Sequence, residues 1–308
     1  MSAGHTAANP ADAAKAQALL FIIPALWAVN YLVARWAPPH IAPHMLALGR
    51  WALAALVLAC IAWPELRAKR QHIAAEWWQF VVLGALGMWV CGAWVYHGAR
   101  STSAINIGLI YATSPVMIAV LSAVWLKEPL RPLQWLGIGL ALAGVVHVVL
   151  SGNWANLLVL QLNPGDLWIA CCAVAWALYA LLLKRWHTEF SPLARLALTA
   201  AGGCAVLALP TGLEVLYGPS SQLNWQAVAL VVAAALLPGA GAYFAYSYMQ
   251  RHLGAARVSA TLYLGPLYAA VFGTVFLGES LGLHHLAGAA LILPGIFLVN
   301  AAARKPGF

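Results

Sequence analysis

The feature that most constrains this chain is a series of ten apolar blocks, each about as long as the roughly 20 residues that a helix needs to cross a bilayer. The blocks cover residues 17–36, 44–64, 77–98, 104–126, 133–150, 166–186, 192–216, 225–248, 255–277 and 284–303. The connections between them are too short to hold a soluble domain. We therefore predict an all-α membrane protein with ten transmembrane helices.

The composition supports this reading. Of the 308 residues, 63% are hydrophobic and 8% are charged, whereas a soluble domain is about 45–50% apolar and about 25% charged. An ordinary soluble enzyme and a disordered chain are therefore excluded. Basic residues are scattered between the apolar blocks rather than clustered, so no nucleic-acid partner is expected. The expected partners are the lipid bilayer and a small-molecule substrate.

The five cysteines all lie inside apolar blocks, and none forms a CxxC pair. This placement is typical of small buried side chains rather than of disulfides or metal ligands. We therefore predict no metal site and no cofactor.

The distribution of Lys and Arg predicts the orientation in the membrane. With a cytoplasmic N-terminus, 13 of the 16 basic residues lie on the cytoplasmic side, as the positive-inside rule requires. The other three are Arg35, Arg50 and Arg100. Both termini are therefore expected in the cytoplasm, as tails over 1–16 and 304–308, with the first apolar block retained as a span.

The chain repeats itself at an offset of 151 residues. The matching positions are Pro115 and Pro266, Glu128 and Glu279, Gly137 and Gly288, and Gly144 and Gly295. The two units, 17–150 and 166–303, each hold five spans and are joined by an external linker over 151–165. Because five is odd, the second unit must enter the membrane inverted. Inverted repeats place a substrate site near the midplane and suit alternating access, although a symmetric channel is an alternative.

These residues also carry a family resemblance. The segment YLGPLYAAVFGTVFLGESL, with Gly288 and Gly295 after it, resembles the EamA repeat of the drug/metabolite transporter superfamily. PALWAVNYLVARW, in the first span, is similar to the first helix of that repeat. The resemblance implies an exporter of small metabolites, often amino acids, in a bacterial cytoplasmic membrane. The Trp and Tyr content is similar to that of the branch that exports aromatic amino acids.

One face of the first span holds the first candidate substrate-binding residues, Trp27, Asn30 and Tyr31. An amide inside hydrocarbon is costly unless it faces water or a partner. Asn30 therefore indicates a cavity wall, or an interhelical hydrogen bond that holds the bundle. Amphipathic aromatic residues in other spans are further candidates, although Trp and Tyr also gather at membrane interfaces. They are Tyr96, Tyr111, Trp176, Tyr179, Tyr243, Tyr246 and Tyr263.

Two basic side chains within the spans have more than one interpretation. His97 could bind a proton or hydrogen-bond a substrate, although a structural donor is the commoner role of a lone histidine. Arg50 could snorkel to the outer interface or hold a substrate carboxylate. The equivalent depth of Arg195 favours a structural role for both arginines.

The paired prolines and glutamates of the repeat are candidate moving parts. Pro115 and Pro266 each remove a helical hydrogen bond, and we predict them to be hinges. Glu128 and Glu279 follow their spans at opposite membrane faces, and we predict that they fix loops or act as gates.

The resulting hypothesis is a monomeric secondary transporter that exports small amphipathic metabolites, most favourably aromatic or apolar amino acids. A multidrug or other metabolite carrier of the same fold is the alternative. An intramembrane enzyme is a more distant alternative, because the chain has no paired acids, HExxH or Ser/His motif in its spans. No Asp or Glu lies in the middle third of a span, so the source of driving force stays open.

Overall fold

A computed structural model describes residues 10–125, 130–155, 163–218, 221–222, 224–246 and 264–303, and all regular elements in these ranges are helical. Seven of the helices are long and apolar enough to cross a membrane, and three further apolar helices are shorter. The prediction of an all-α chain with several candidate membrane spans is thereby confirmed for the described residues, while the count of ten transmembrane helices stays a prediction.

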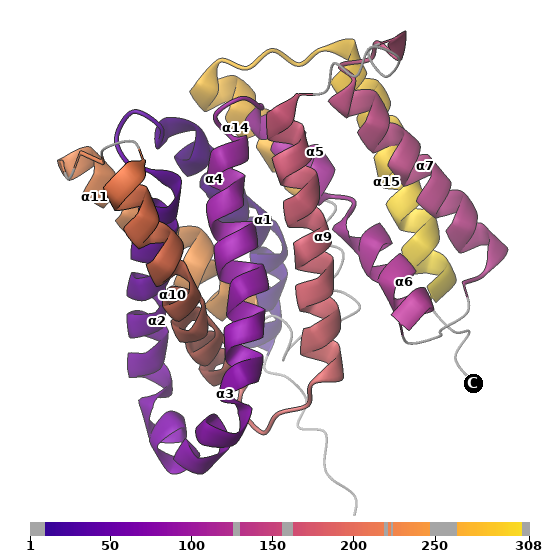
Figure 1. Ribbon diagram of the computed structural model, residues 1–308. Coiled ribbons are helices and arrows are strands. Elements are labelled where there is room, and N and C mark those ends of the chain that lie inside the picture. Colours follow the sequence, from indigo (N-terminus) through magenta and orange to yellow (C-terminus); the bar gives the residue numbers. More distant parts are fainter. Residues whose placement is uncertain are drawn as a thin grey trace, which may run out of the picture.

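The helices follow one another along the chain as Figure 1 shows. They are α1 (Pro10–Trp36), α2 (Pro43–Ala68), α3 (Arg70–Gly84), η1 (Ala85–Trp94), α4 (Val95–Gly98), α5 (Ala104–Tyr111), α6 (Ser114–Trp125), α7 (Pro132–Val149), α9 (Pro164–Arg185), α10 (Pro192–Tyr217), α11 (Trp225–Ala234), η2 (Ala235–Gly241), α14 (Gly265–Leu277) and α15 (Leu283–Ala303). Five of them begin at a proline, whose fixed φ suits the first helical position and whose missing N–H would have no partner there.

Three of the predicted spans are not uniform α-helices. The third passes from α3 through the π-helical segment η1 into α4, and the eighth contains a second π-helical segment, η2. Within η2, Gly239 has non-helical angles (φ −80°, ψ −105°) directly after Pro238. The fourth span is divided into α5 and α6 by a turn at Ala112 and Thr113. Such interruptions commonly mark functional sites.

Helices α7 and α15 lie side by side at one edge of the molecule (Figure 1). Their backbones approach so closely that a Cβ on Gly144 would lie 2.8 Å from the Gly288 carbonyl oxygen, and one on Gly295 would lie 2.6 Å from the Gly137 carbonyl oxygen. Gly144 and Gly295 correspond to each other at the offset of 151 residues, and so do Gly137 and Gly288. The two contacts are therefore equivalent, with the roles of the two helices exchanged. A two-fold relation between the halves requires this reciprocity.

Helices α2 and α10 form a second close pair in which each supplies the other's N-terminal cap. Glu214, near the end of α10, accepts hydrogen bonds from the backbone N–H groups of His44 (2.8 Å) and Met45 (3.0 Å) in the first turn of α2. Glu65, near the end of α2, accepts from the N–H (2.7 Å) and the hydroxyl (2.6 Å) of Ser191, directly before α10. These bonds satisfy N–H groups that have no partner within their own helices.

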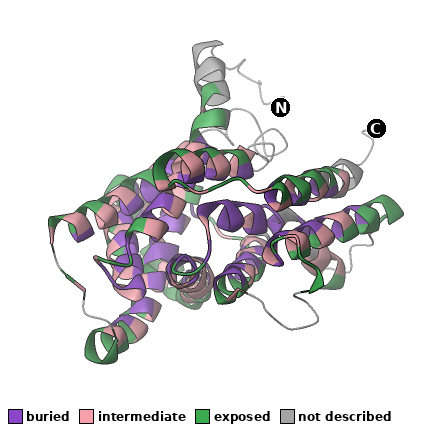
Figure 2. Cartoon of the chain, turned by 90° about the horizontal axis from the view of Figure 1, so that it is seen from above, coloured by how far each residue is buried: buried purple, intermediate pink, exposed green. Residues whose placement is uncertain are grey.

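The main apolar core lies between these two helices and α1, α4, α5 and α9. Seen from above, buried residues gather in the middle of the bundle and exposed ones on its outer helices (Figure 2). A smaller cluster fills the space between α5, α7 and α15. Of these core helices, α1, α2, α5 and α9 also contribute to the wall of a cavity, together with η1, α6, η2 and α14.

Candidate functional site

The cavity has a volume of about 170 Å³ and is lined by residues from both halves of the chain. An apolar cavity of about 150 Å³ accepts benzene, so there is room here for the body of one small molecule. The lining residues are Pro24, Trp27, Asn30, Tyr31, Arg50, Trp51, Gly87, Cys91, Gly108, Tyr111, Ala112, Ser114, Ile118, Trp176, Pro238, Tyr243, Gly265 and Pro266.

Arg50 is the charged residue of this lining, and it is only 6% exposed. Its guanidinium donates to the carboxamide oxygen of Asn30 (2.8 Å) and to the hydroxyl oxygen of Tyr96 (3.1 Å). The hydroxyl of Tyr96 in turn donates to the same Asn30 oxygen (2.9 Å). The ring of Trp51 lies under the guanidinium, 4.6 Å from its central carbon. Arg50 is therefore held in place by neutral groups.

The positive charge of Arg50 is not balanced by an acidic partner in the part of the chain that the structure describes. Its Nε is also buried without a hydrogen-bond partner there. Buried donors in native proteins are nearly always paired, so an unpaired one needs an explanation. A ligand with an acceptor oxygen would supply the missing partner.

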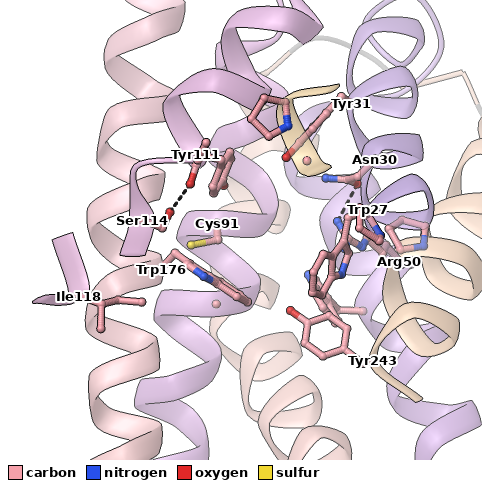
Figure 3. Close-up of a pocket in the computed structure, with 18 residues that line it drawn as sticks. Trp27, Asn30, Tyr31, Arg50, Cys91, Tyr111, Ser114, Ile118, Trp176 and Tyr243 are labelled. Atoms are coloured by element: carbon pink, nitrogen blue, oxygen red, sulfur yellow. Dashed lines mark hydrogen bonds between the residues drawn. The ribbon is translucent and has the colours of Figure 1, made fainter. Parts of the chain in front are cut away.

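The rest of the wall is largely aromatic. In Figure 3, Tyr111, Cys91 and Trp176 lie across an open space from Trp27 and Tyr243. The ring of Tyr31 stacks on that of Tyr111 at 6.4 Å, and Tyr243 meets the rings of Trp27 and Trp51 edge-on, each at 6.3 Å. Such rings suit a ligand that is partly apolar and partly polar.

Several of the predicted substrate-binding residues thus line the cavity: Trp27, Asn30, Tyr31, Tyr111, Trp176 and Tyr243. Asn30 combines both of its interpretations, because it faces the cavity and bonds to other helices. Tyr96 is buried and does not line the cavity, but its hydroxyl is hydrogen-bonded to Arg50 and Asn30, which do. Tyr179 stacks on Trp176 at 5.2 Å, and Tyr246 contacts Trp27 at 5.6 Å, but neither lines the cavity.

His97 lies away from the cavity, at the end of α4, where its ring is 5.0 Å from that of His44 and stacks on that of Trp168 at 5.7 Å. His97 therefore belongs to a different cluster from the residues that line the cavity.

Two other residues predicted from the sequence, Tyr263 and Glu128, lie outside the described residues.

The candidate hinge and gate residues stand at helix ends. Pro266, the second residue of α14, lines the cavity, and Pro115 is the second residue of α6, directly after the break in the fourth span. Glu279 accepts hydrogen bonds from the N–H groups of Ala104 (2.8 Å) and Ile105 (3.2 Å), and its carboxylate lies 3.5 Å from Nε of Arg35. Glu279 thus joins the ends of α1, α5 and α14.

Sequence reasoning did not select several of the residues that line the cavity. Arg50 is recognisable in the sequence as a charge inside an apolar block. Because Arg195 lies at an equivalent depth in its own span, the sequence favours a structural role for both arginines. Arg195 instead donates to the carbonyl oxygens of Leu183 (3.0 Å) and Trp186 (2.8 Å). Trp51, Cys91 and Pro238 carry no distinguishing pattern in an apolar span.

A family model and similar individual proteins both match this chain to transporters. Residues 15–150 and 163–301 each match the EamA-like transporter family. The chain is 26% identical over 282 residues to the "Uncharacterized transporter YyaM" of Bacillus subtilis (strain 168), covering 91% of each chain. It is 28% identical over 286 residues to a "Probable terminal-alkyne amino-acid exporter" of Streptantibioticus cattleyicolor, covering 90% of this chain and 93% of that protein.

A solved crystal structure matches the fold with a TM-score of 0.62 and 20% sequence identity. The match covers 94% of this chain and 98% of the other. At this identity the likeness concerns the fold alone.

Proposed function

The chain belongs to the EamA-like transporter family, and we propose that it is a secondary transporter that exports small amphipathic carboxylates, above all amino acids with aromatic or apolar side chains. It works as a monomer in a bacterial cytoplasmic membrane, with both termini in the cytoplasm. Its ten spans are arranged as two inverted units over 17–150 and 166–303, and spans of both units line the cavity.

The observation that carries this proposal is the unbalanced charge of Arg50 at the cavity wall. A guanidinium held by Asn30 and Tyr96 is neutralised best by an anion that brings its own oxygens. Arginine binds carboxylates through paired, charge-assisted hydrogen bonds. A substrate carboxylate would therefore bind at Arg50.

The aromatic lining supports the other part of the substrate. The faces of Trp27 and Trp176 can attract an ammonium group by a cation–π interaction, while Tyr31 and Tyr111 offer an apolar surface with polar edges. An amino acid with an apolar or aromatic side chain carries all three groups that this wall and Arg50 would bind: a carboxylate, an ammonium and an apolar body. The amino-acid exporter among the relatives is consistent with this substrate class.

Alternating access would come from movement of one half against the other. The reciprocal contacts of α7 with α15 and of α2 with α10 support the inverted arrangement. Pro115 and Pro266 would act as hinges, since each stands at the start of a helix beside the cavity or the broken span. Glu279 and Arg35 would close one end, because their ion pair connects α1 with the turn after α14.

A carrier of cationic drugs is the alternative within this fold. Recognition of a cation inside a membrane generally uses a buried carboxylate. The described lining of the cavity contains no Asp or Glu and does contain Arg50. The sign of the charge therefore favours an anionic or zwitterionic substrate.

Counterflow in proteoliposomes tests the substrate class. Vesicles loaded with an unlabelled amino acid are diluted into the labelled one, and the panel covers aromatic, aliphatic, acidic and basic side chains together with a cationic dye. We expect uptake of aromatic and aliphatic amino acids and none of the dye. Uptake of the dye alone, or of nothing in the panel, would overturn the proposal.

A further inference from the structure

Three side chains that are far apart in the sequence meet outside the cavity, at the start of α2, in α4 and near the end of α10. Nδ1 of His44 lies 3.1 Å from Oε1 of Glu214, and Nε2 of His97 lies 3.4 Å from the same His44 nitrogen. The three atoms all lie within 4.8 Å of one another. Nothing in the proposed transport cycle uses this cluster.

The distances match those between ligands of one metal ion. Zinc binds imidazole nitrogen at about 2.0–2.1 Å and carboxylate oxygen at about 2.0–2.2 Å, so neighbouring ligand atoms of a tetrahedral site are about 3.3 Å apart. The separations of 3.1 and 3.4 Å lie on either side of that value. Two imidazoles and one carboxylate also leave the fourth tetrahedral position for water.

The surroundings hold these groups in position. The second oxygen of Glu214 accepts from the N–H groups of His44 and Met45, which leaves Oε1 turned toward the imidazoles. The Thr211 hydroxyl donates to the His44 carbonyl oxygen at 3.3 Å. Support of this kind around a metal ligand fixes its orientation and raises affinity. The side chains of His44 and Glu214 are 15% and 8% exposed, so the cluster is neither fully enclosed nor freely solvated.

We propose that His44, His97 and Glu214 form a binding site for one first-row transition-metal ion, with Zn²⁺ as its best probe. Imidazole with a single carboxylate selects such ions over Mg²⁺ and Ca²⁺, which prefer oxygen ligands alone. The ion would connect α2 and α4 of the first half to α10 of the second. Bound metal would therefore fasten the two halves together at this end of the bundle.

Titration of the purified full-length protein with ZnCl₂ by calorimetry tests the site. We expect one saturable Zn²⁺ per chain in the wild type. His97→Gln and Glu214→Gln each remove one ligand. Loss of a residue that only supports a ligand already lowers metal affinity by roughly tenfold or more, so each of these variants should weaken Zn²⁺ binding by at least that factor. The matched control is His72→Gln, which removes the histidine of another His–Glu pair, with Glu189 at 3.5 Å.

A second measurement tests the site in the wild type and does not depend on the variants. Co²⁺ added to the wild type should give the visible absorption of a tetrahedral nitrogen and oxygen site, and Zn²⁺ should remove it. Size-exclusion profiles establish which variants remain folded. The proposal is overturned if His97→Gln and Glu214→Gln bind Zn²⁺ as the wild type does, or if Co²⁺ stays octahedral. Because binding is measured without transport, a failure of the proposed function would leave this result intact.

Discussion

The guanidinium of Arg50 donates to the carboxamide oxygen of Asn30 across 2.8 Å, and this contact joins α2 to α1 at the wall of the cavity. Asn30 also accepts from Tyr96, so one amide oxygen anchors two donors from two helices. The arrangement aims a permanent positive charge at a space lined by aromatic rings. The proposed binding of a substrate carboxylate at Arg50 depends on this geometry.

Replacement of Trp27 by alanine is expected to change which substrates are carried while the protein still folds. Loss of aromatic contacts worth about 0.5–1.5 kcal/mol should weaken aromatic substrates by up to about tenfold. Smaller aliphatic substrates should be much less affected. Half-saturation concentrations in counterflow measure the change, and Trp63→Ala, whose side chain is 61% exposed at the bundle surface, is the control. Equal losses in both variants would speak against a role for Trp27 in the cavity.

Replacement of Gly144 by alanine is expected to destabilise the pair α7 and α15. The added methyl group would lie 2.7 Å from a side-chain carbon of Ile292 and 2.8 Å from the Gly288 carbonyl oxygen. Overpacking of this kind costs about 1–3 kcal/mol. Gly139→Ala on the same helix is the matched control, because its methyl group would have no neighbour within 4 Å. Thermal unfolding in detergent should show a lower midpoint for the first variant only; equal midpoints would contradict the close contact.

Replacement of Glu279 by alanine is expected to destabilise the protein more than replacement of Arg35. The first change leaves two N–H groups at the start of α5 without their acceptor, and loss of a helix cap costs about 0.5–2 kcal/mol. The second removes the same ion pair, in which Arg35 is 32% exposed and which contributes about 0–1 kcal/mol, together with one hydrogen bond from Arg35 to the Ala99 carbonyl oxygen. Unfolding midpoints of the two variants give the comparison. A larger loss from Arg35→Ala would contradict this prediction, and would show that the hydrogen bond from Arg35 to the Ala99 carbonyl oxygen matters more at this end than the cap does.

The helices could be predicted because their signals are local. Runs of apolar residues with prolines at their starts define α7, α9 and α10 to within one or two residues of the observed bounds. For α2 they give the start to within one residue, but the helix runs four residues past the predicted end. The small residues that recur at the offset of 151 also belong to the contact of α7 with α15. Continuous hydrophobicity cannot reveal the turn at Ala112 and Thr113 or the π-helical segments, because it reports length and not backbone geometry.

The site was predictable only in part, because its polar contacts join distant positions. Trp27, Asn30 and Tyr31 share one helix face, so periodicity identifies them together. The role proposed for Arg50 depends on Asn30 and Tyr96, which lie 20 and 46 residues away. His97 stands out in the sequence as a lone polar residue, but its partners, His44 and Glu214, are brought to it by the packing of α2, α4 and α10.

The most direct test of the account compares an amino acid with its uncharged carboxamide in counterflow, for the wild type and for Arg50→Gln. Hydrogen bonds to charged groups contribute about 1.5–3 kcal/mol, so the wild type should prefer the carboxylate by roughly tenfold or more. Arg50→Gln should lose that preference and still carry the carboxamide, whereas Arg195→Gln, which removes an arginine outside the cavity lining, should keep it. Undiminished preference for the carboxylate in folded Arg50→Gln would contradict the central claim.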